Sequence, residues 1–234
     1  MNKTMGVIGG MGALATAIFY AIVTNAQDRQ VEVEQDYLDM IIYSKTSIPD
    51  RTAYILGQSD ADPTADIIAA AITLEQAGAD FLAMPCVTAH YFYREVADLV
   101  GIPFINLLDE IAAHVESEGL KRVGLLATQG TLQSRILHTV LEDRGVEVLT
   151  PGETEQALLM DMIYSIKVGG HVTGRDFDNL EDALFARGAQ SIILGCTELS
   201  LIKGEIVTER IDALSVLARA ALKMKNEDPG SSLG

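Results

Sequence analysis

The amino-acid sequence predicts an α/β protein with two similar halves, each built on a central, mostly parallel sheet flanked by helices. Short apolar runs alternate with helical patterns along the 234 residues, which is the element order of a parallel sheet. A segment of the first half is also repeated in the second half. Hydrophobic residues make up 48% of the chain, which is enough for a sizeable core.

Six short apolar runs predict the strands. A parallel strand covered by helices on both faces is apolar throughout, rather than alternating between apolar and polar residues. In chain order the runs are MGVIG (5–9), LDMIIY (38–43), FLAMP (81–85), VGLLAT (123–128), VEVL (146–149) and SIILG (191–195).

Helical periodicity predicts helices between these strands. Apolar residues three and four positions apart share one face of a helix, and a glycine often ends the helix. The expected faces are Ile68, Ala71 and Ile72 before Gly78, then Ile136, Leu137, Val140 and Leu141 before Gly145, then Leu158, Leu159, Met162, Ile163 and Ile166. A last apolar helix, at about 212–225, is expected to pack against the first half.

An internal repeat divides the chain. The segment AGADFLAMPCVT (77–88) aligns with RGAQSIILGCT (187–197), because each has a Gly-Ala pair, an apolar strand and then a cysteine. We therefore expect a first half at 1–105, which the returning helix at 212–226 joins, and a second half at 106–211. The end of the chain, 227–234, is expected to be a flexible tail.

The charge of the chain disfavours several kinds of partner. Its formal net charge of −16 at pH 7 is unsuited to a nucleic acid or to an anionic membrane surface. No run of about 18 apolar residues is present to span a membrane, and MNKTMGVIGG lacks the apolar stretch of a signal peptide. We therefore expect a cytoplasmic protein whose two cysteines are reduced thiols.

The segment GGMGALA (9–15) has the letters of a dinucleotide-binding loop, G-x-G-x-x-A, from its second glycine. Such a site needs an acidic residue for the ribose at the end of the second strand. Asp28, Glu32 and Glu34 all precede that strand, which ends in YSK (43–45). The sequence therefore favours a sharp turn that brings the backbone close to a small carboxylate ligand.

Cys86 and Cys196 each follow a strand of the repeat, at the sheet edge where parallel sheets bind ligands. If the halves face each other, the two thiols lie on opposite sides of one cleft. One thiol can then remove a proton from one face of a carbon while the other delivers a proton to the opposite face, which inverts a stereocentre. A buried cysteine is often only a small apolar side chain, but equivalent positions in a repeat favour catalysis.

A metal site is disfavoured by the spacing of the available ligands. Zinc sites use cysteines and histidines at close, regular intervals. Besides its two cysteines the chain has four scattered histidines, His90, His114, His138 and His171. We therefore expect no bound metal.

Four segments together resemble the aspartate racemases of the Asp/Glu racemase superfamily: GGMGALATAIFY, EQDYLDMIIYSKTSIPDRTAYI, MPCVTAH and LGCTEL. They occur in the family's order, and the resemblance runs from about residue 4 to about residue 225. It implies two Rossmann-like halves related by a pseudo-dyad, usually in a homodimer. It also implies interconversion of L- and D-aspartate, a small acidic amino acid, by paired cysteines with no cofactor.

The resemblance further implies the residues of the site. Cys86 and Cys196 match the two catalytic thiols, and His90 and Glu198 lie beside them, where either a tuning or a structural role is open. Cationic side chains would attract a dicarboxylic substrate to a net-acidic protein. The positions that match substrate contacts are Met11, Arg51, Thr52, Val87, Thr88, Thr128, Thr131, Lys167 and Thr197.

Val87 departs from the family pattern, which is Pro-Cys-Asn-Thr-Ala-His. Valine keeps the backbone N–H but lacks the amide that would hold a charged group of the substrate. The loss of such a hydrogen bond costs about 1.5–3 kcal/mol. The activity is then weak, or the substrate differs, or another residue compensates.

Three functions remain open from the sequence. An aspartate racemase is favoured. The second is an enzyme of the same scaffold acting on another acidic substrate: a racemase of glutamate or another acid, or an enzyme of the maleate-isomerase or arylmalonate-decarboxylase type. The third is a non-catalytic binder of acidic amino acids, with Val87 as the mark of lost activity. Paired thiols argue against decarboxylation, which needs one proton donor, but not against maleate isomerisation.

Overall fold

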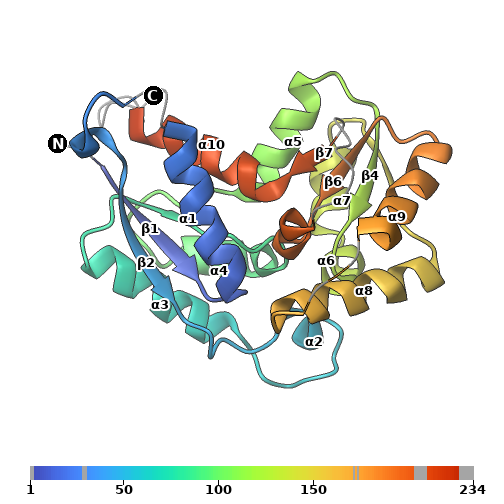
Figure 1. Cartoon of the computed structure of the whole chain (residues 1–234). Coiled ribbons are helices and arrows are strands. Elements are labelled where there is room, and N and C mark those ends of the chain that lie inside the picture. Colours follow the sequence, from blue (N-terminus) through green and yellow to red (C-terminus); the bar gives the residue numbers. More distant parts are fainter. Residues whose placement is uncertain (1–2, 28–30, 171, 173, 203–209, 227–234) are drawn as a thin grey trace.

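The computed structural model describes residues 3–27, 31–170, 172, 174–202 and 210–226. The expected flexible tail, Asp28 and His171 lie outside these residues. The chain folds into two α/β units that lie side by side, with the first unit in blue and teal and the second in green to orange (Figure 1).

The elements that precede the second sheet run from β1 to α5. They are β1 (Thr4–Gly9), α1 (Ala13–Gln27), η1 (Glu34–Asp36), β2 (Asp39–Ser44), α2 (Arg51–Ile55), α3 (Thr64–Gln76), β3 (Phe81–Ala83), η2 (Thr88–Phe92), α4 (Tyr93–Ala97) and α5 (Leu107–Ser117).

The remaining elements begin with the second sheet. They are β4 (Arg122–Leu126), α6 (Gln129–Ser134), α7 (Ile136–Glu142), β5 (Glu147–Leu149), α8 (Glu153–Lys167), α9 (Gly174–Ala186), β6 (Ser191–Leu194), η3 (Thr197–Leu201), β7 (Arg210–Asp212) and α10 (Ala213–Asn226).

Both sheets are parallel, so the expected α/β fold with two helix-flanked sheets is confirmed. The first has the strand order β2-β1-β3 and the second the order β5-β4-β6-β7. In the first, Val7 pairs with Ile42 on one side and Ala83 on the other. β1 and β4 thus hold equivalent central positions, with β3 and β6 beside them.

The sequence repeat corresponds to a repeat in structure. Gly78 and Gly188 follow α3 and α9 with φ of 98° and 94°, a left-handed conformation that favours glycine. The chain then enters β3 or β6 and reaches a cysteine. Because the carboxyl edges of parallel strands carry the following loops, both cysteines lie at such an edge.

Three sequence expectations need correction. The buried face of α3 consists of Ile67, Ala70, Ala71 and Leu74, whereas Ile68 and Ile72 are only half-buried, so the apolar face was placed one residue too far along the chain. Leu158 of α8 is 42% exposed and does not belong to the core face. The strand β7 was not expected, because the three residues RID (210–212) are too short and too charged to form an apolar run.

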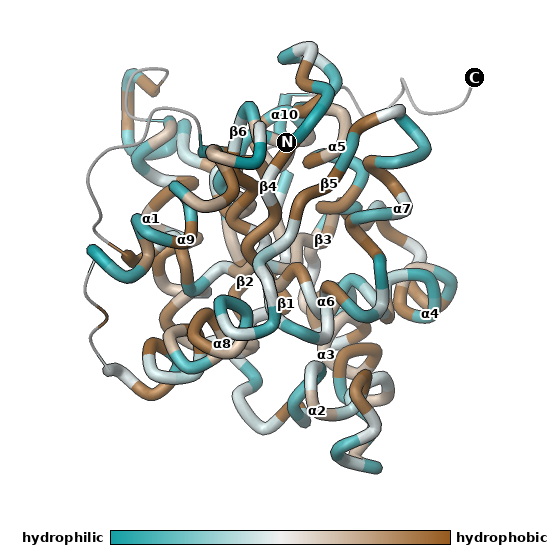
Figure 2. Tube along the Cα trace, turned by 90° about the vertical axis from the view of Figure 1, so that its right-hand side faces the viewer, coloured by the Kyte–Doolittle hydropathy of each residue, from teal (hydrophilic) through white to brown (hydrophobic). Residues whose placement is uncertain are grey.

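One apolar cluster connects the two units. It joins Met5 and Val7 of β1 to Val123 and Leu125 of β4, and α10 adds Leu214, Leu217, Ala218 and Ala221. α10 lies beside α1, where Lys225 Nζ donates to Gln27 Oε1 at 3.0 Å (Figure 1). Figure 2 shows hydrophobic segments gathered at the middle of the view and hydrophilic turns at its margin.

Candidate active site

One small cavity brings together nearly all of the residues that the sequence singles out. Its volume is about 10 Å³, and loops from both units line it. The lining residues are Met11, Arg51, Thr52, Cys86, Val87, Thr88, Thr128, Lys167, Cys196, Thr197 and Glu198. Thr131 is not part of the lining but bonds to two hydroxyls that are.

The glycine-rich loop after β1 forms one wall. Gly10 has φ of 90°, and its N–H donates to Thr16 Oγ1 at 3.0 Å. A Cβ on Gly10 would lie 2.5 Å from the backbone carbonyl carbon of Lys45, so this position requires glycine, and a Cβ on Gly12 would lie 2.7 Å from Glu198 Oε1 and would displace that carboxylate. The loop is therefore a close-packed turn at the site, as the sequence predicts for a small ligand.

Both thiols are buried in this cavity. Cys86 follows β3 and is 6% exposed, and Cys196 follows β6 and is 5% exposed. The Cys196 thiol donates to Glu198 Oε2 at 3.0 Å. Burial raises the pKa of Cys196 well above its ordinary value, and the Glu198 carboxylate raises it further, whereas Lys167 lowers it. Cys196 therefore carries its proton in the free protein.

Three threonine hydroxyls join the two units next to the thiols. Thr88 Oγ1 lies 2.9 Å from Thr128 Oγ1 and 3.0 Å from Thr131 Oγ1, and the latter two are 3.1 Å apart. Thr128 also caps α6, where its hydroxyl accepts from Thr131 N–H at 3.2 Å. These contacts hold the turn after Cys86 against the first turn of α6.

Arg51 is a buried cation whose guanidinium is only partly satisfied. Nη1 donates to the carbonyls of Ile48 and Pro49 at 3.2 and 2.9 Å, and Nη2 donates to the carbonyl of Met11 at 3.3 Å. Its Nε has no hydrogen-bond partner within the described part of the chain. A buried donor without a partner is costly, so this N–H is suited to an anionic group of a ligand.

Lys167 is the second cation, at the end of α8. Burial lowers its pKa, but the negative charges that Cys196, Glu198 and Cys86 carry when ionised outweigh this effect and raise the pKa above its ordinary value. Its Nζ lies 5.0 Å from the centroid of the Tyr164 ring. Lys167 is therefore charged at neutral pH and able to stabilise a thiolate or a carboxylate.

His90 and Val87 flank Cys86 without presenting charge. His90 Nδ1 lies 2.8 Å from the Cys86 carbonyl, and burial lowers the pKa of His90 to about 4, so its imidazole is neutral and donates this hydrogen bond. Val87 is 1% exposed and packs in the apolar cluster that connects the two units. Val87 thus serves as both an apolar cavity wall and a core residue.

Among the residues that the structure describes, no group of three or more His, Cys, Asp or Glu side chains is placed to hold a metal ion. The helices within the same described ranges are too short or too polar to cross a bilayer.

Comparison with known families agrees with this geometry. A model described as Asp/Glu/hydantoin racemase matches residues 8–221. The chain belongs to this family. As a member, it is an isomerase, an amino-acid racemase of the Asp/Glu racemase family.

Relatives of this family member cover almost its whole length. The broad specificity amino-acid racemase RacX of Bacillus subtilis (strain 168) is 30% identical over 93% of this chain and 96% of its own length. The structure of Picrophilus torridus aspartate racemase matches with a TM-score of 0.86 and 28% identity, over 97% of this chain and 95% of that one. An aspartate racemase homologue from Pyrococcus horikoshii OT3 has a TM-score of 0.78 and 26% identity, over 97% and 100% of the two chains.

The sequence placed Glu198 beside the thiols with either a tuning or a structural role, and the structure shows that it lines the cavity and accepts a hydrogen bond from Cys196. Tyr164, which lies next to the cavity rather than in its lining, was not foreseen. Its hydroxyl donates to Asp50 Oδ2 at 3.0 Å and so ties α8 to the start of α2, a contact between residues 114 positions apart that no local pattern reveals.

Proposed function

We propose that the protein interconverts L- and D-aspartate with two thiols and no cofactor. The observation that supports this most is the composition of the small cavity. It holds both cysteines together with a buried donor, Arg51 Nε, and a buried acceptor, Glu198 Oε1, neither of which has a partner within the described residues. A donor for a carboxylate and an acceptor for an ammonium, in the same cavity as paired thiols, suit an α-amino acid.

The proton transfers follow from the two thiols. For one enantiomer the Cys86 thiolate removes the α-proton, forming an S–H bond as the C–H bond breaks, and the protonated Cys196 donates its proton to the other face of the same carbon. For the other enantiomer the two roles are exchanged. Lys167 and Arg51 stabilise the negative charge that develops on the substrate, while Thr88 and Thr197 donate to its α-carboxylate.

Substrate entry requires the cavity to open. A volume of about 10 Å³ is close to that of one water molecule, and no amino acid fits it. The walls come from separate segments, including the start of α2 and the start of α6, so a small separation of the two units would admit a ligand. Reclosure would then exclude water from the thiolate and strengthen its interactions with Lys167.

Deuterium uptake at Cα tests this function. The protein is incubated with L-aspartate, or with D-aspartate, in D₂O without any added cofactor, and mass spectrometry and chiral chromatography follow the product. We expect deuterium at Cα together with formation of the opposite enantiomer. If aspartate takes up no deuterium while glutamate does, the substrate assignment is wrong. If a maleate-type diacid reacts and neither amino acid does, the racemase proposal is wrong and the protein is an enzyme of the maleate-isomerase type.

A further inference from the structure

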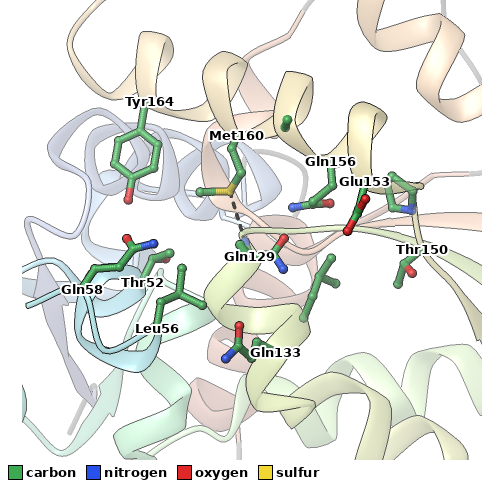
Figure 3. Close-up of a pocket in the computed structure, with 13 residues that line it drawn as sticks. Thr52, Leu56, Gln58, Gln129, Gln133, Thr150, Glu153, Gln156, Met160 and Tyr164 are labelled. Atoms are coloured by element: carbon green, nitrogen blue, oxygen red, sulfur yellow. Dashed lines mark hydrogen bonds between the residues drawn. The ribbon is translucent and has the colours of Figure 1, made fainter.

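A second, much larger pocket lies next to the cavity that contains the thiols. Its volume is about 680 Å³, which is within the range of pockets that bind small molecules. It lies between the end of α2, α6 and α8, and its lining residues are Thr52, Leu56, Gln58, Gln129, Leu132, Gln133, Thr150, Pro151, Glu153, Gln156, Ala157, Met160 and Tyr164 (Figure 3). We refer to it as the amide pocket, because four glutamines line it.

The amide pocket adjoins the thiol cavity. Thr52 lines both, and the neighbours Thr128 and Gln129 line one each. On the other side, Tyr164 lines the amide pocket while Lys167, whose Nζ lies over its ring, lines the thiol cavity. A ligand whose Cα lies between the thiols can therefore extend its side chain past Thr52 into the amide pocket when the cavity opens.

The polar side chains of the amide pocket are glutamines, threonines and a tyrosine, which can both donate and accept hydrogen bonds, and the one charged side chain among its described lining residues is the carboxylate Glu153. None of its lining residues is an arginine or a lysine, and Glu153 is an exposed carboxylate at its rim. The pocket therefore disfavours a second carboxylate, such as the side chain of glutamate, and attracts a cation.

Gln156 provides an unfilled acceptor. Its side-chain Nε2 donates to the Ala127 carbonyl at 3.0 Å, while its Oε1 is buried without a hydrogen-bond partner within the described residues. The residue is only 6% exposed. Figure 3 shows the side chains of Glu153, Gln156 and Met160 extending from α8 toward Gln129 of α6. Because a buried acceptor without a partner is costly, Gln156 is suited to a donor that a ligand brings.

We propose that the amide pocket receives the side chain of a second substrate class, an amino acid with a long side chain that ends in a protonated nitrogen. Lysine represents this class. The inference rests on the proposed two-thiol function, and the step at Cα is unchanged: one thiolate accepts the α-proton and the other thiol donates one. The terminal ammonium donates to Gln156 Oε1 and faces the Glu153 carboxylate. This pocket compensates for the anchoring group that Val87 lacks.

The first experiment compares side chains of similar length. The full chain is incubated in D₂O with L-lysine, L-norleucine, L-glutamate or L-aspartate, and the initial rates of deuterium uptake at Cα are measured. We expect lysine to exchange about tenfold or more faster than norleucine, because a charged donor meets a buried acceptor. Lysine exchange no faster than norleucine exchange overturns the proposal.

Variants on α8 test the assignment of the pocket. Glu153→Gln should lower the ratio of lysine to aspartate exchange about two- to fivefold, a modest change because the carboxylate is exposed. Gln156→Leu should lower the same ratio about tenfold. Asp161→Asn removes the same charge from an exposed position of α8 outside the pocket and should leave the ratio unchanged. Equal effects of Glu153→Gln and Asp161→Asn contradict the proposal.

Calorimetry distinguishes failure of this inference from failure of the proposed function. Aspartate exchange without lysine exchange overturns the inference alone. If neither amino acid exchanges, the two-thiol function fails, and titration of the wild type with lysine decides whether the pocket binds it. Lysine binding that is weaker in Glu153→Gln but unchanged in Asp161→Asn supports a ligand with a protonated nitrogen at the end of its side chain. If lysine does not bind, the assignment of the amide pocket to this ligand class is wrong as well.

Discussion

The Sγ atom of Cys196 lies 3.0 Å from Glu198 Oε2, and the thiol donates this hydrogen bond. Both groups are buried at the wall of one cavity, where the carboxylate favours the protonated thiol. Cys196 is thus prepared as a proton donor. Its conversion to a base needs a positive charge, which Lys167 provides, since Lys167 acts on the pKa of Cys196 in the opposite direction.

Replacement of Glu198 by glutamine should lower the pKa of Cys196. The substitution removes both the negative charge and the carboxylate acceptor, each of which raises that pKa. The measurement is a pH titration of thiolate ultraviolet absorbance in a Cys86→Ser background, where Cys196 is the only cysteine. Lys167→Met should shift the pKa upward in the same assay. An unchanged or higher pKa in Glu198→Gln would show that the carboxylate does not control this thiol.

Cys86→Ala and Cys196→Ala should each abolish racemisation of aspartate, because each removes the acid or base that serves one face of Cα. Each variant should retain α-proton exchange with one enantiomer only, since one thiol remains. Chiral chromatography and deuterium uptake, measured on the same samples, separate the two effects. Full racemisation by either variant would exclude the two-thiol mechanism.

Val87→Asn should raise the turnover of aspartate, because the amide would orient the substrate between the thiols. A small misplacement of reacting atoms costs roughly 10²-fold in rate. Because Val87 is buried in the apolar cluster, the same change should also lower stability, by about 1–3 kcal/mol. Initial rates over a range of L-aspartate concentrations test the first effect, and thermal unfolding tests the second.

Val87→Ala is the matched control, because it enlarges the cavity without adding a polar group. If Val87→Ala raises turnover as much as Val87→Asn does, space rather than anchoring limits the reaction. If Val87→Asn leaves turnover unchanged or lowers it, the site is adapted to valine, and a substrate with an apolar group near that wall is favoured.

The stability of the protein should fall as the pH drops from about 6.5 to about 4. His90 is neutral and buried in the folded chain with a pKa of about 4, against 6.5 for an ordinary histidine, so the unfolded chain binds more protons in this window. The contribution of His90 is fully present above pH 6.5 and falls by on the order of 3 kcal/mol across the window. Denaturant unfolding of wild type and His90→Gln at several pH values should show a smaller loss in the variant. Parallel losses in both would assign the effect to other groups.

The sequence alone determined the strands β1 to β6, the repeat and the position of the two cysteines after β3 and β6. These features are local, because a buried parallel strand is an apolar run and a left-handed helix end favours glycine. The strand ends predicted the two cysteines of the thiol cavity. The resemblance to the racemase family, rather than any local pattern, named most of the other residues that line it, including Arg51 in α2 and Lys167 at the end of α8. The buried face of α3 was misplaced by one residue because the adjacent apolar residues Ile67 and Ile68 leave two registers open until a sheet packs against one of them.

Only the tertiary structure decided that the thiol cavity is closed and that a larger pocket adjoins it at Thr52. The same is true of the contact between Tyr164 and Asp50 and of the unpartnered Oε1 of Gln156. Each of these depends on how α2, α6 and α8 meet, and these helices come from distant parts of the chain. Cavity volume and the pairing of buried polar atoms result from packing across such distances, and no periodicity within one segment encodes them.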